Sequence, residues 1–264
     1  GPGQSHPGQP GWLFVFGHSN ILLTVLVRRA AGDVWNSFGS SGKHLENRFR
    51  EKPLEPFKNN ISPDLVRCIG GHVAQHHAGF DQLGFEADIL EELGSLELKQ
   101  RAALIARHLD HHLPRQLPAR FAILQAMLHP MTEVAFDRGS DEQGIRGWGM
   151  MPLGMVVAAS GLDDFDASFA LLKEMTKRAT AEFDVRPFLA RDQDQALAIM
   201  APWVKDESVH VRRLVSEGTR PRLPWGMRLQ ALVADPTPTL PLLEALKDDP
   251  EDYVRRSVAN HLND

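Results

Sequence analysis

A short pattern that recurs three times toward the C-terminal end constrains the fold of this chain more than any other feature. Each copy holds two adjacent basic residues and, near its end, a small residue; the copies are Thr176–Glu182, Val211–Glu217 and Val254–Asn260. The second and third copies begin 254 − 211 = 43 residues apart. The glutamates that end the first two copies are 217 − 182 = 35 residues apart. Periods of this length, with helical rather than strand patterning, are typical of proteins built from stacked helical repeats.

Helical patterning also covers most of the chain before these copies. Apolar residues recur at spacings of three and four from Leu65 to Leu93, after Ser62 and Pro63, which supply a cap and a first-turn proline. Further helices are expected over residues 98–109, 119–128, 152–160, 164–182, 187–191, 194–205, 208–217, 225–234, 239–247 and 251–262, with a long polar loop over 136–149. No stretch of alternating β-branched residues competes, so we predict an all-α solenoid of HEAT-like repeats.

The domain organisation follows from where this pattern begins. We assign residues 51–264 to one repeat domain, which is long enough to bury a continuous core. Residues 1–50 show no such pattern, and we treat them as a tag-derived segment or a poorly ordered extension. The chain ends at Asp264 within an expected helix, so we expect that C-terminal repeats are missing from it.

Composition restricts the classes of function. The net charge of −5 argues against binding nucleic acid through overall basicity, but it allows a local basic surface. The single cysteine, Cys68, excludes a disulfide within the chain and indicates a reducing compartment, so we expect a cytoplasmic protein. No apolar run reaches the roughly 18 to 20 residues that span a bilayer, so we expect no membrane partner. We also expect a monomer.

Two groups of histidines have a spacing that is compatible with metal binding on a helix. They are His72, His76 and His77, and His108, His111 and His112. Neither group comes with the further ligands that would complete a metal site, so structural or surface histidines are expected and no metal. The chain also lacks a glycine-rich phosphate loop, a nucleophile elbow and a paired-cysteine motif, so we expect no organic cofactor.

The repeated basic pairs allow two interpretations. Arg178 with Glu182, and Arg213 with Glu217, are four residues apart and would form solvated ion pairs within their helices. Alternatively, stacking of the repeats aligns the pairs into a surface that follows a phosphate backbone, with the members Lys177, Arg178, Arg212, Arg213, Arg255 and Arg256. Phosphate would repel acids placed among them, so the glutamates would need another purpose, such as facing positive charge on a sugar or a base.

The segment after Glu217 adds further candidates for binding. Arg220 and Arg222 lie in a proline-rich stretch between two expected helices and suit phosphate contacts. Trp225 ends this stretch. It either stacks on a base or sugar, or begins the next helix and packs into the core.

Three long segments resemble the AlkC branch of the AlkC/AlkD family of HEAT-like DNA alkylation repair proteins: Thr176–Leu189, Arg212–Trp225 and Tyr253–Asp264. The stretch Leu54–Asn59 is similar to that family's N-terminal opening. The resemblance implies a DNA glycosylase that excises positively charged N-alkylated bases, such as 3-methyladenine, 3-methylcytosine or 1-methyladenine, from duplex DNA. It further implies that the base is not flipped into a pocket.

The resemblance also assigns roles to particular residues. It implies that Glu182, Glu217 and Asp264 are the acidic residues at the lesion, and that Arg213, Arg220 and Arg222 contact the DNA backbone. These roles suit the chemistry, because a cationic base leaves without a general acid and carboxylates can stabilise an oxocarbenium-like sugar and position water.

Two other classes of function stay open at this stage. One is a non-catalytic HEAT scaffold that binds a protein partner or DNA, and the other is a lyase-like HEAT protein that acts on a pigment or a modified side chain. The glycosylase hypothesis requires Glu182 and Glu217 to converge on one site flanked by Arg213 and Arg220. A scaffold is favoured if these acids point outward from separate faces.

Overall fold

The computed structural model describes residues 56–132 and 139–264. The extension predicted over residues 1–50 and the first part of the predicted loop lie outside the described residues. Within those two ranges the chain is helical, with no strand and only two isolated bridges, Leu128 to Ile145 and Asp141 to Gly144. The predicted all-α fold is confirmed.

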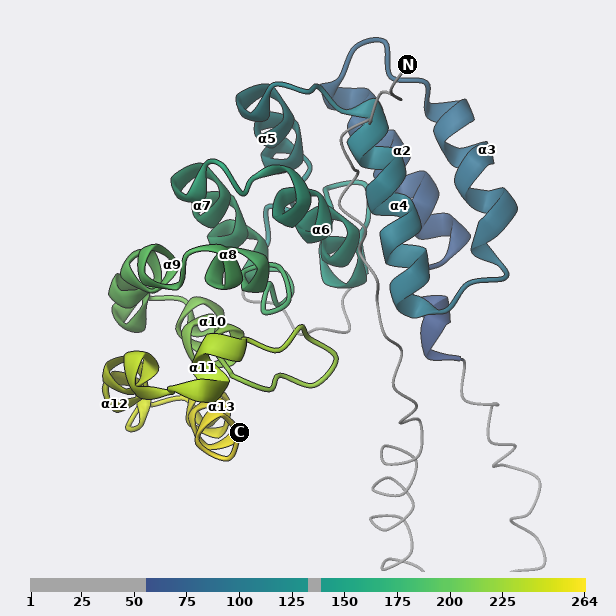
Figure 1. Ribbon diagram of the computed structural model, residues 1–264. Helices are drawn as coiled ribbons and strands as arrows, with labels where there is room; N and C mark the ends of the chain where they lie inside the picture. The colour runs from purple at the N-terminus through teal and green to yellow at the C-terminus, as the bar shows by residue number, and fades with distance from the viewer. Residues whose placement is uncertain (1–55, 133–138) are drawn as a thin grey trace, which may run out of the picture. The chain divides into compact units, whose positions relative to one another are not determined.

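Most α-helices of the described residues are joined by short turns or short 3-10 helices, while longer connections follow α5 and α10 (Figure 1). The α-helices are α2 (Pro63–His76), α3 (Gln82–Leu93), α4 (Leu98–His112), α5 (Leu117–Ala126), α6 (Met150–Ser160), α7 (Phe165–Thr176), α8 (Arg186–Arg191), α9 (Gln193–Met200), α10 (Val209–Gly218), α11 (Gln230–Ala234), α12 (Leu240–Leu246) and α13 (Asp252–Leu262). The 3-10 helices are η2 (Phe57–Asn60), η3 (Gly147–Gly149), η4 (Ala201–Lys205) and η5 (Thr237–Thr239). None of these helices is long and apolar enough to cross a membrane.

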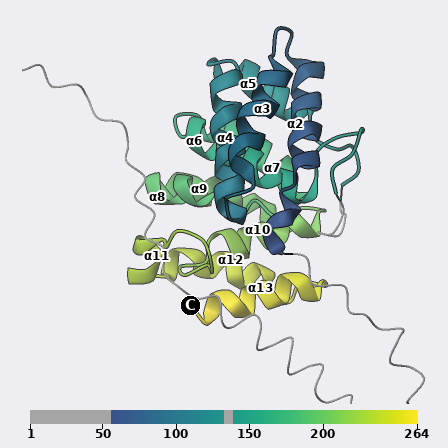
Figure 2. The same ribbon diagram turned by 90° about the vertical axis from the view of Figure 1, so that its right-hand side faces the viewer.

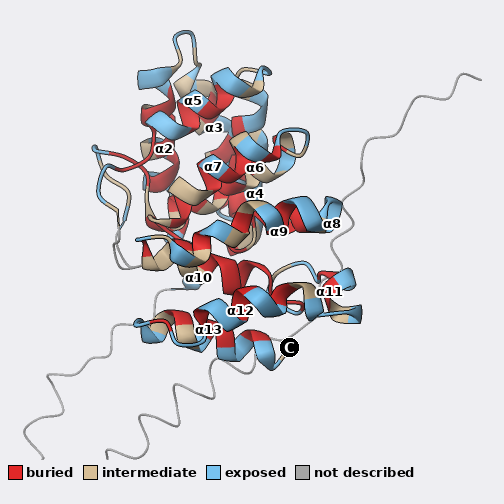
Figure 3. Cartoon of the chain, turned by 90° about the vertical axis from the view of Figure 1, so that its left-hand side faces the viewer, coloured by how far each residue is buried: buried red, intermediate tan, exposed pale blue. Residues whose placement is uncertain are grey.

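Helices that are near in the sequence pack side by side, as in a repeat protein. Contacts run from α2 to α3, α3 to α4, α4 to α6 and α6 to α7, and then from α10 to α12 and α13 (Figures 1 and 2). The inward faces form one continuous core, in which Phe85, Phe169 and Phe188 are fully buried (Figure 3). Helices α10 and α13 carry the two sequence copies 43 residues apart, so the sequence repeat corresponds to a structural repeat.

The first predicted helix begins as the sequence indicates. Ser62 is the N-cap of α2, and its hydroxyl oxygen accepts a hydrogen bond from the backbone N–H of Leu65 at 3.2 Å. Pro63 occupies the first helical position, where no backbone N–H is required. The pattern-based prediction of this helix start is confirmed.

The helix predicted over residues 164–182 ends earlier than expected. Helix α7 stops at Thr176, and the first copy of the repeated pattern continues in turns. The side chain of Arg178 folds back and donates to the carbonyl oxygen of Glu174 at 2.7 Å, a carbonyl in the last turn of α7. A basic side chain that binds the last carbonyls of a helix is a common helix end. The expected pair between Arg178 and Glu182 is therefore wrong, because Arg178 forms its ion pair with Glu174 instead.

The stretch before α11 is a long loop rather than the start of a helix. Helix α11 begins at Gln230, so the helix predicted over 225–234 loses its first half. Trp225 has a positive backbone angle, φ 66°, which a right-handed helix does not contain. The described part of the other predicted loop, residues 139–149, is non-helical up to residue 146 as expected, but its last three residues form the 3-10 helix η3. However, its Ile145 is fully buried, because its backbone pairs with Met127 and His129.

Candidate active site

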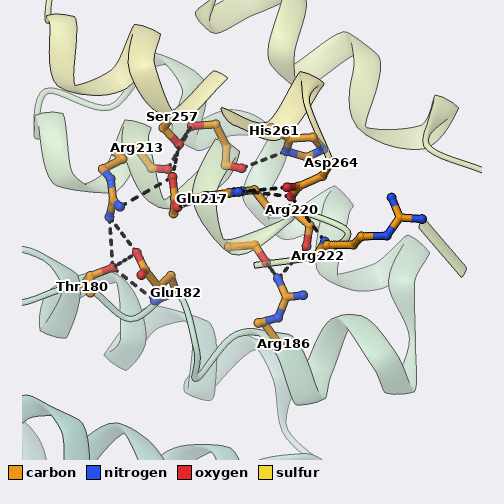
Figure 4. A network of polar contacts seen from close by, with 12 residues as sticks. Thr180, Glu182, Arg186, Arg213, Glu217, Arg220, Arg222, Ser257, His261 and Asp264 are labelled. Carbon is orange, nitrogen blue, oxygen red and sulfur yellow. Dashed lines mark hydrogen bonds and ion pairs between the residues drawn. The ribbon is translucent and has the colours of Figure 1, made fainter. Parts of the chain in front are cut away.

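Three acidic and two basic side chains form one connected chain of ion pairs (Figure 4). Its members are Glu182, Arg213, Glu217, Arg220 and Asp264. Arg213 lies 2.7 Å from Glu182 and 3.5 Å from Glu217, measured between guanidinium nitrogen and carboxylate oxygen. Arg220 lies 2.8 Å from Glu217 and binds both carboxylate oxygens of Asp264 at 2.9 Å. The acids that the sequence singled out therefore meet at one place and alternate with Arg213 and Arg220.

Glu182 comes from the turn after α7, and its neighbours fix its position. The hydroxyl of Thr180 donates to Oε2 of Glu182 at 2.6 Å, and Arg213 donates to the same oxygen at 2.7 Å. The other oxygen, Oε1, accepts no hydrogen bond from the described residues. Glu182 is buried, yet it keeps an oxygen with free accepting capacity.

Glu217 and Asp264 are more fully satisfied. Oε1 of Glu217 accepts from Arg220, and Oε2 accepts from the hydroxyl of Ser257 on α13 at 2.7 Å. Oδ2 of Asp264 accepts from the backbone N–H of Arg222 at 3.3 Å in addition to Arg220. Both side chains are largely hidden from solvent. These contacts give the two acids a structural role, whatever chemistry they also perform.

The hydrogen bonds and ion pairs within the ion-pair chain shift the pKa values of its members. Burial alone would raise the pKa of Asp264, but the guanidinium of Arg220 and the backbone N–H of Arg222 hold it below its usual value. Hydrogen bonds to Asp264 and Glu217 raise the pKa of Arg220, against the effect of burial. Burial opposes a similar rise for Arg213, but the nearby Glu182 carboxylate raises its pKa. Asp264, Arg213 and Arg220 are therefore charged at neutral pH.

One further acid, Asp184, lies near Glu182 of the ion-pair chain, and its pKa is shifted in the opposite direction to that of Asp264. Asp184 is buried, and burial followed by the charge of Glu182 raises its pKa well above the usual value. Its carboxylate fills the space above Gly154, where an added Cβ would lie 2.2 Å from Oδ2. Any side chain at position 154 would displace this carboxylate, so the glycine is required by close packing.

The first members of the second and third basic pairs, Arg212 and Arg255, have a shared structural role. Arg212 donates to the carbonyl oxygens of residues 206 and 207 at 2.9 and 3.0 Å. Arg255, its equivalent 43 residues later, donates to those of residues 249 and 250 at 2.6 and 2.8 Å. Each arginine thus closes the turn that precedes its own helix. Arg212 also forms an ion pair with Asp249 at 2.6 Å, which joins the two repeats.

The second members lie in three different environments. Arg178 is buried, and its guanidinium binds the carbonyl oxygen of His129 as well as that of Glu174. Arg213 belongs to the ion-pair chain, whereas Arg256 is exposed and pairs with Asp252 at 2.8 Å. The structure thus brings only Arg213 of the six paired residues to the acids. Lys177 forms an ion pair with Glu174 at 2.7 Å. Whether these residues contact DNA stays a prediction.

The loop between α10 and α11 places its other candidates at the surface. Arg222 is exposed, and its guanidinium points away from the ion-pair chain (Figure 4). Trp225 is 57% exposed, so it does not belong to the core. Its ring contacts that of Phe57 at a centroid distance of 6.3 Å, and the ammonium of Lys99 lies 5.8 Å from its centroid. Of the two interpretations of Trp225, the structure favours a surface role.

Several residues of the site had no distinctive signal in the sequence. Thr180 and Ser257 are small hydroxyl residues within the repeated pattern, where they vary between copies. Lys99 and Phe57 are distant in the sequence from the loop that they contact. The histidines take structural positions in part, since His72 is buried and binds the carbonyl oxygen of Asp141 at 2.8 Å. Among the described residues, no three histidine, cysteine or acidic side chains are grouped to hold a metal ion.

The buried carboxylates give the protein a predicted dependence of stability on pH. Burial would raise the pKa of Asp249 and Asp264, but their ion pairs with Arg212 and Arg220 lower both values below the usual one. A lowered pKa in the folded state adds stability above the unfolded pKa near 4, and this stability is lost as pH falls through the folded value. We expect the free energy of unfolding, measured in urea, to fall below about pH 4. The fall should be shallower in Asp249→Asn, and equal curves for the variant and the wild type would contradict this account.

Comparison with known proteins finds no matching family model but does find similar proteins. The uncharacterized protein YhaZ of Bacillus subtilis (strain 168) is 36% identical over 212 residues, which are 80% of this chain and 56% of that protein. The Pseudomonas fluorescens alkylpurine DNA glycosylase AlkC, solved bound to DNA containing an abasic site analog, is 36% identical with a TM-score of 0.69. The alignment covers 79% of this chain and 55% of that one. The chain thus spans little more than half the length of both relatives.

Fold and sequence lead to the same assignment. The helical repeats extend over the described residues, and the identity with AlkC holds over most of this chain. The resemblance first seen in the repeated pattern is confirmed: over 79% of its length, this chain is similar in sequence and in fold to the helical-repeat protein AlkC.

Proposed function

We propose that this protein is a DNA glycosylase that hydrolyses the N-glycosidic bond of cationic N-alkylated bases in duplex DNA. The observation that carries the proposal is the convergence of Glu182, Glu217 and Asp264, from three separate segments, on one ion-pair chain with Arg213 and Arg220. The similarity to AlkC, which was solved with DNA, supports DNA as the substrate. The proposed bases are 3-methyladenine, 3-methylcytosine and 1-methyladenine.

The proposed reaction needs little acid catalysis. Alkylation puts a positive charge on the base, so the bond from C1′ to the base nitrogen breaks with both electrons going to the base, which leaves as a neutral molecule. The sugar then carries the developing positive charge, which carboxylates stabilise. Water adds to C1′, and the proton it loses passes to a carboxylate or to solvent. We assign this acceptor role to Glu182, because its Oε1 accepts no hydrogen bond from the described residues.

The arginines serve the acids in this proposal. Each lies between two carboxylates and holds them in place through ion pairs. Arg222 and Trp225, exposed on the neighbouring loop, are proposed to contact the phosphate backbone and a base or sugar. The proposed excision requires no flipped-base pocket, no metal and no organic cofactor, and it requires neither a membrane nor a second copy of the chain. The expected cytoplasmic location also remains a prediction.

One observation favours a second candidate, a helical-repeat protein that binds DNA without cleaving a bond. All three acids are already paired with arginines, and Glu217 has hydrogen bonds to both of its oxygens. In that case the ion-pair chain would only join the repeats. The two candidates differ in one measurable product, the free base.

The test is to incubate the protein with duplex oligonucleotides that each carry one methylated base, and to identify released bases by chromatography with mass detection. We expect release of at least one of the three cationic bases and none from the unmodified duplex. The pattern of released bases would also establish which lesion is preferred. Binding to the duplexes without any release would favour the second candidate, and no binding would exclude both.

A further inference from the structure

Among the described residues, the largest fully buried side chain is a charged one, Arg186 at the start of α8. Its guanidinium forms no ion pair within the described residues and donates only to backbone carbonyl oxygens. The acceptors are Gly218 at 2.9 Å, Arg220 at 2.8 Å, Pro221 at 3.4 Å and Met227 at 2.7 Å. A buried cation is costly unless its donors are satisfied, and here four carbonyl groups satisfy it.

All four acceptors belong to one segment, which runs from the last residue of α10 through the loop before α11. Gly218 and Arg220 are at its start, and Met227 is near its end. One rigid, planar guanidinium therefore joins both ends of the loop from below (Figure 4). A lysine could not do the same, because its ammonium is a single point with only three donors.

The loop that Arg186 holds carries the residues that the proposed function uses. From this loop, the side chain of Arg220 binds Glu217 and Asp264, and the backbone N–H of Arg222 binds Asp264. Trp225 lies between the two groups of anchored carbonyls. The loop thus connects the ion-pair chain to the exposed indole.

The backbone at Trp225 is strained, which points to a conformation that its surroundings impose. Trp225 is the non-glycine residue with a positive φ angle in the described part of the chain, and bulky residues rarely adopt that region. Its carbonyl oxygen accepts a hydrogen bond from the ammonium of Lys99 on α4, and Arg186 binds the carbonyl of Met227 two residues later. These two anchors hold the strained turn and leave the indole 57% exposed.

Arg186 also adds charge beneath the ion-pair chain. Burial lowers its pKa to about 10, while Asp264, Glu182 and Glu217 favour its charged form and Arg220 opposes it. It therefore stays charged at neutral pH. Its positive charge adds to those of Arg213 and Arg220 near the three acids, although its donors bind only backbone carbonyls.

We propose that Arg186 is a positioning residue: its buried guanidinium holds the loop from Gly218 to Met227, so that Arg220 and the strained Trp225 stay in register with the acids. This rests on the proposed function, because register matters to base release only if the acids act on the sugar. Misplacing a reacting group by about 1 Å can lower a rate about a hundredfold, so the expected effect is large.

The first test replaces the guanidinium by an ammonium in Arg186→Lys, with Arg191→Lys as the matched control. Arg191 is on the same helix, exposed, and pairs with Asp163. We expect kcat for release of a methylated base to fall about tenfold or more in Arg186→Lys, at a temperature where the variant is folded, and to stay unchanged in Arg191→Lys. A lower folding temperature with unchanged kcat and KM would show that Arg186 only supports the fold, and would overturn the proposal.

A second variant crowds the side chain of Arg186 without replacing it, and it serves if Arg186→Lys fails to fold. An added Cβ at Gly226 would lie 3.1 Å from Cδ2 of Leu223 and 3.2 Å from Nε of Arg186, so Gly226→Ala crowds the arginine side chain while keeping every charge. We expect a smaller fall in kcat of the same kind, about threefold. An unchanged kcat in a folded Gly226→Ala, together with an unchanged loop by the measurement below, would contradict the proposal.

A measurement without catalysis separates this proposal from the proposed function. The emission of Trp225 is obtained as the difference between each protein and its Trp225→Phe counterpart. We expect this emission to shift in Arg186→Lys and Gly226→Ala, and not in Arg191→Lys, because the loop loses its anchor. An unchanged emission overturns the proposal even if the protein releases bases. A shifted emission in a protein that releases no base supports the proposal that Arg186 holds the loop, and refutes only the proposed function.

Discussion

Glu182→Gln is expected to lower the rate of base release from methylated duplex DNA by about a hundredfold, with almost no change in folding temperature. The loss of one preorganised charge beside a developing cation typically costs this much in rate. The fold should tolerate the change, because the amide oxygen of glutamine can still accept the hydrogen bonds from Thr180 and Arg213 that now reach Oε2. The measurement is a single-turnover assay with excess protein, beside a thermal unfolding curve.

Glu244→Gln is the matched control for this change. Glu244 is exposed on α12, pairs with Lys247 at 2.5 Å, and lies outside the ion-pair chain. Glu244→Gln removes the same negative charge as Glu182→Gln, so any effect of net charge on DNA binding appears in both variants. If Glu182→Gln releases bases as fast as Glu244→Gln, Glu182 does not act on the sugar.

The second large effect is expected on stability rather than on rate. Arg220→Met should lower the free energy of unfolding by about 3–5 kcal/mol, because it leaves the carboxylates of the buried Glu217 and the largely covered Asp264 without their shared cation. Methionine has a similar length and adds no charge, so lost packing contributes little. Urea unfolding at neutral pH measures the change.

Two further variants show whether the unpaired charge is the cause. Arg256→Met removes an exposed arginine whose side chain is 71% accessible and pairs with Asp252, so we expect a change of about 0–1 kcal/mol. Adding Asp264→Asn to Arg220→Met should restore part of the lost stability, because it neutralises a carboxylate that has lost its guanidinium partner. If the double variant is as unstable as Arg220→Met alone, the ion pair with Asp264 is not what stabilises the loop.

The repeated pattern predicted the fold correctly because a repeat protein is specified locally. Each helix pair packs on its neighbours, so the period and the apolar spacing already contain most of the architecture. The cap at Ser62 is of the same kind, since it depends on residues within one turn. The error at the end of α7 has a tertiary cause, because the guanidinium of Arg178 also binds the carbonyl of His129, 49 residues away.

The site was predictable in its acids but not in its connections. The repeat drew attention to Glu182 and Glu217, and the resemblance added Asp264. Arg212 and Arg213 are adjacent and chemically identical, yet one closes a turn and the other joins two acids. Nothing in their sequence positions distinguishes these roles, because they depend on which groups the next repeat places opposite.

The sequence by itself determined that the chain is an all-α stack of repeats and which carboxylates are its candidate catalytic groups. Only the tertiary structure decided that Arg220 binds Asp264, 44 residues away, and that the buried Arg186 holds the loop bearing Trp225. The physical reason is range. Helical spacing and caps act over a few residues along the chain, whereas an ion pair or a buried guanidinium needs partners that only packing brings together.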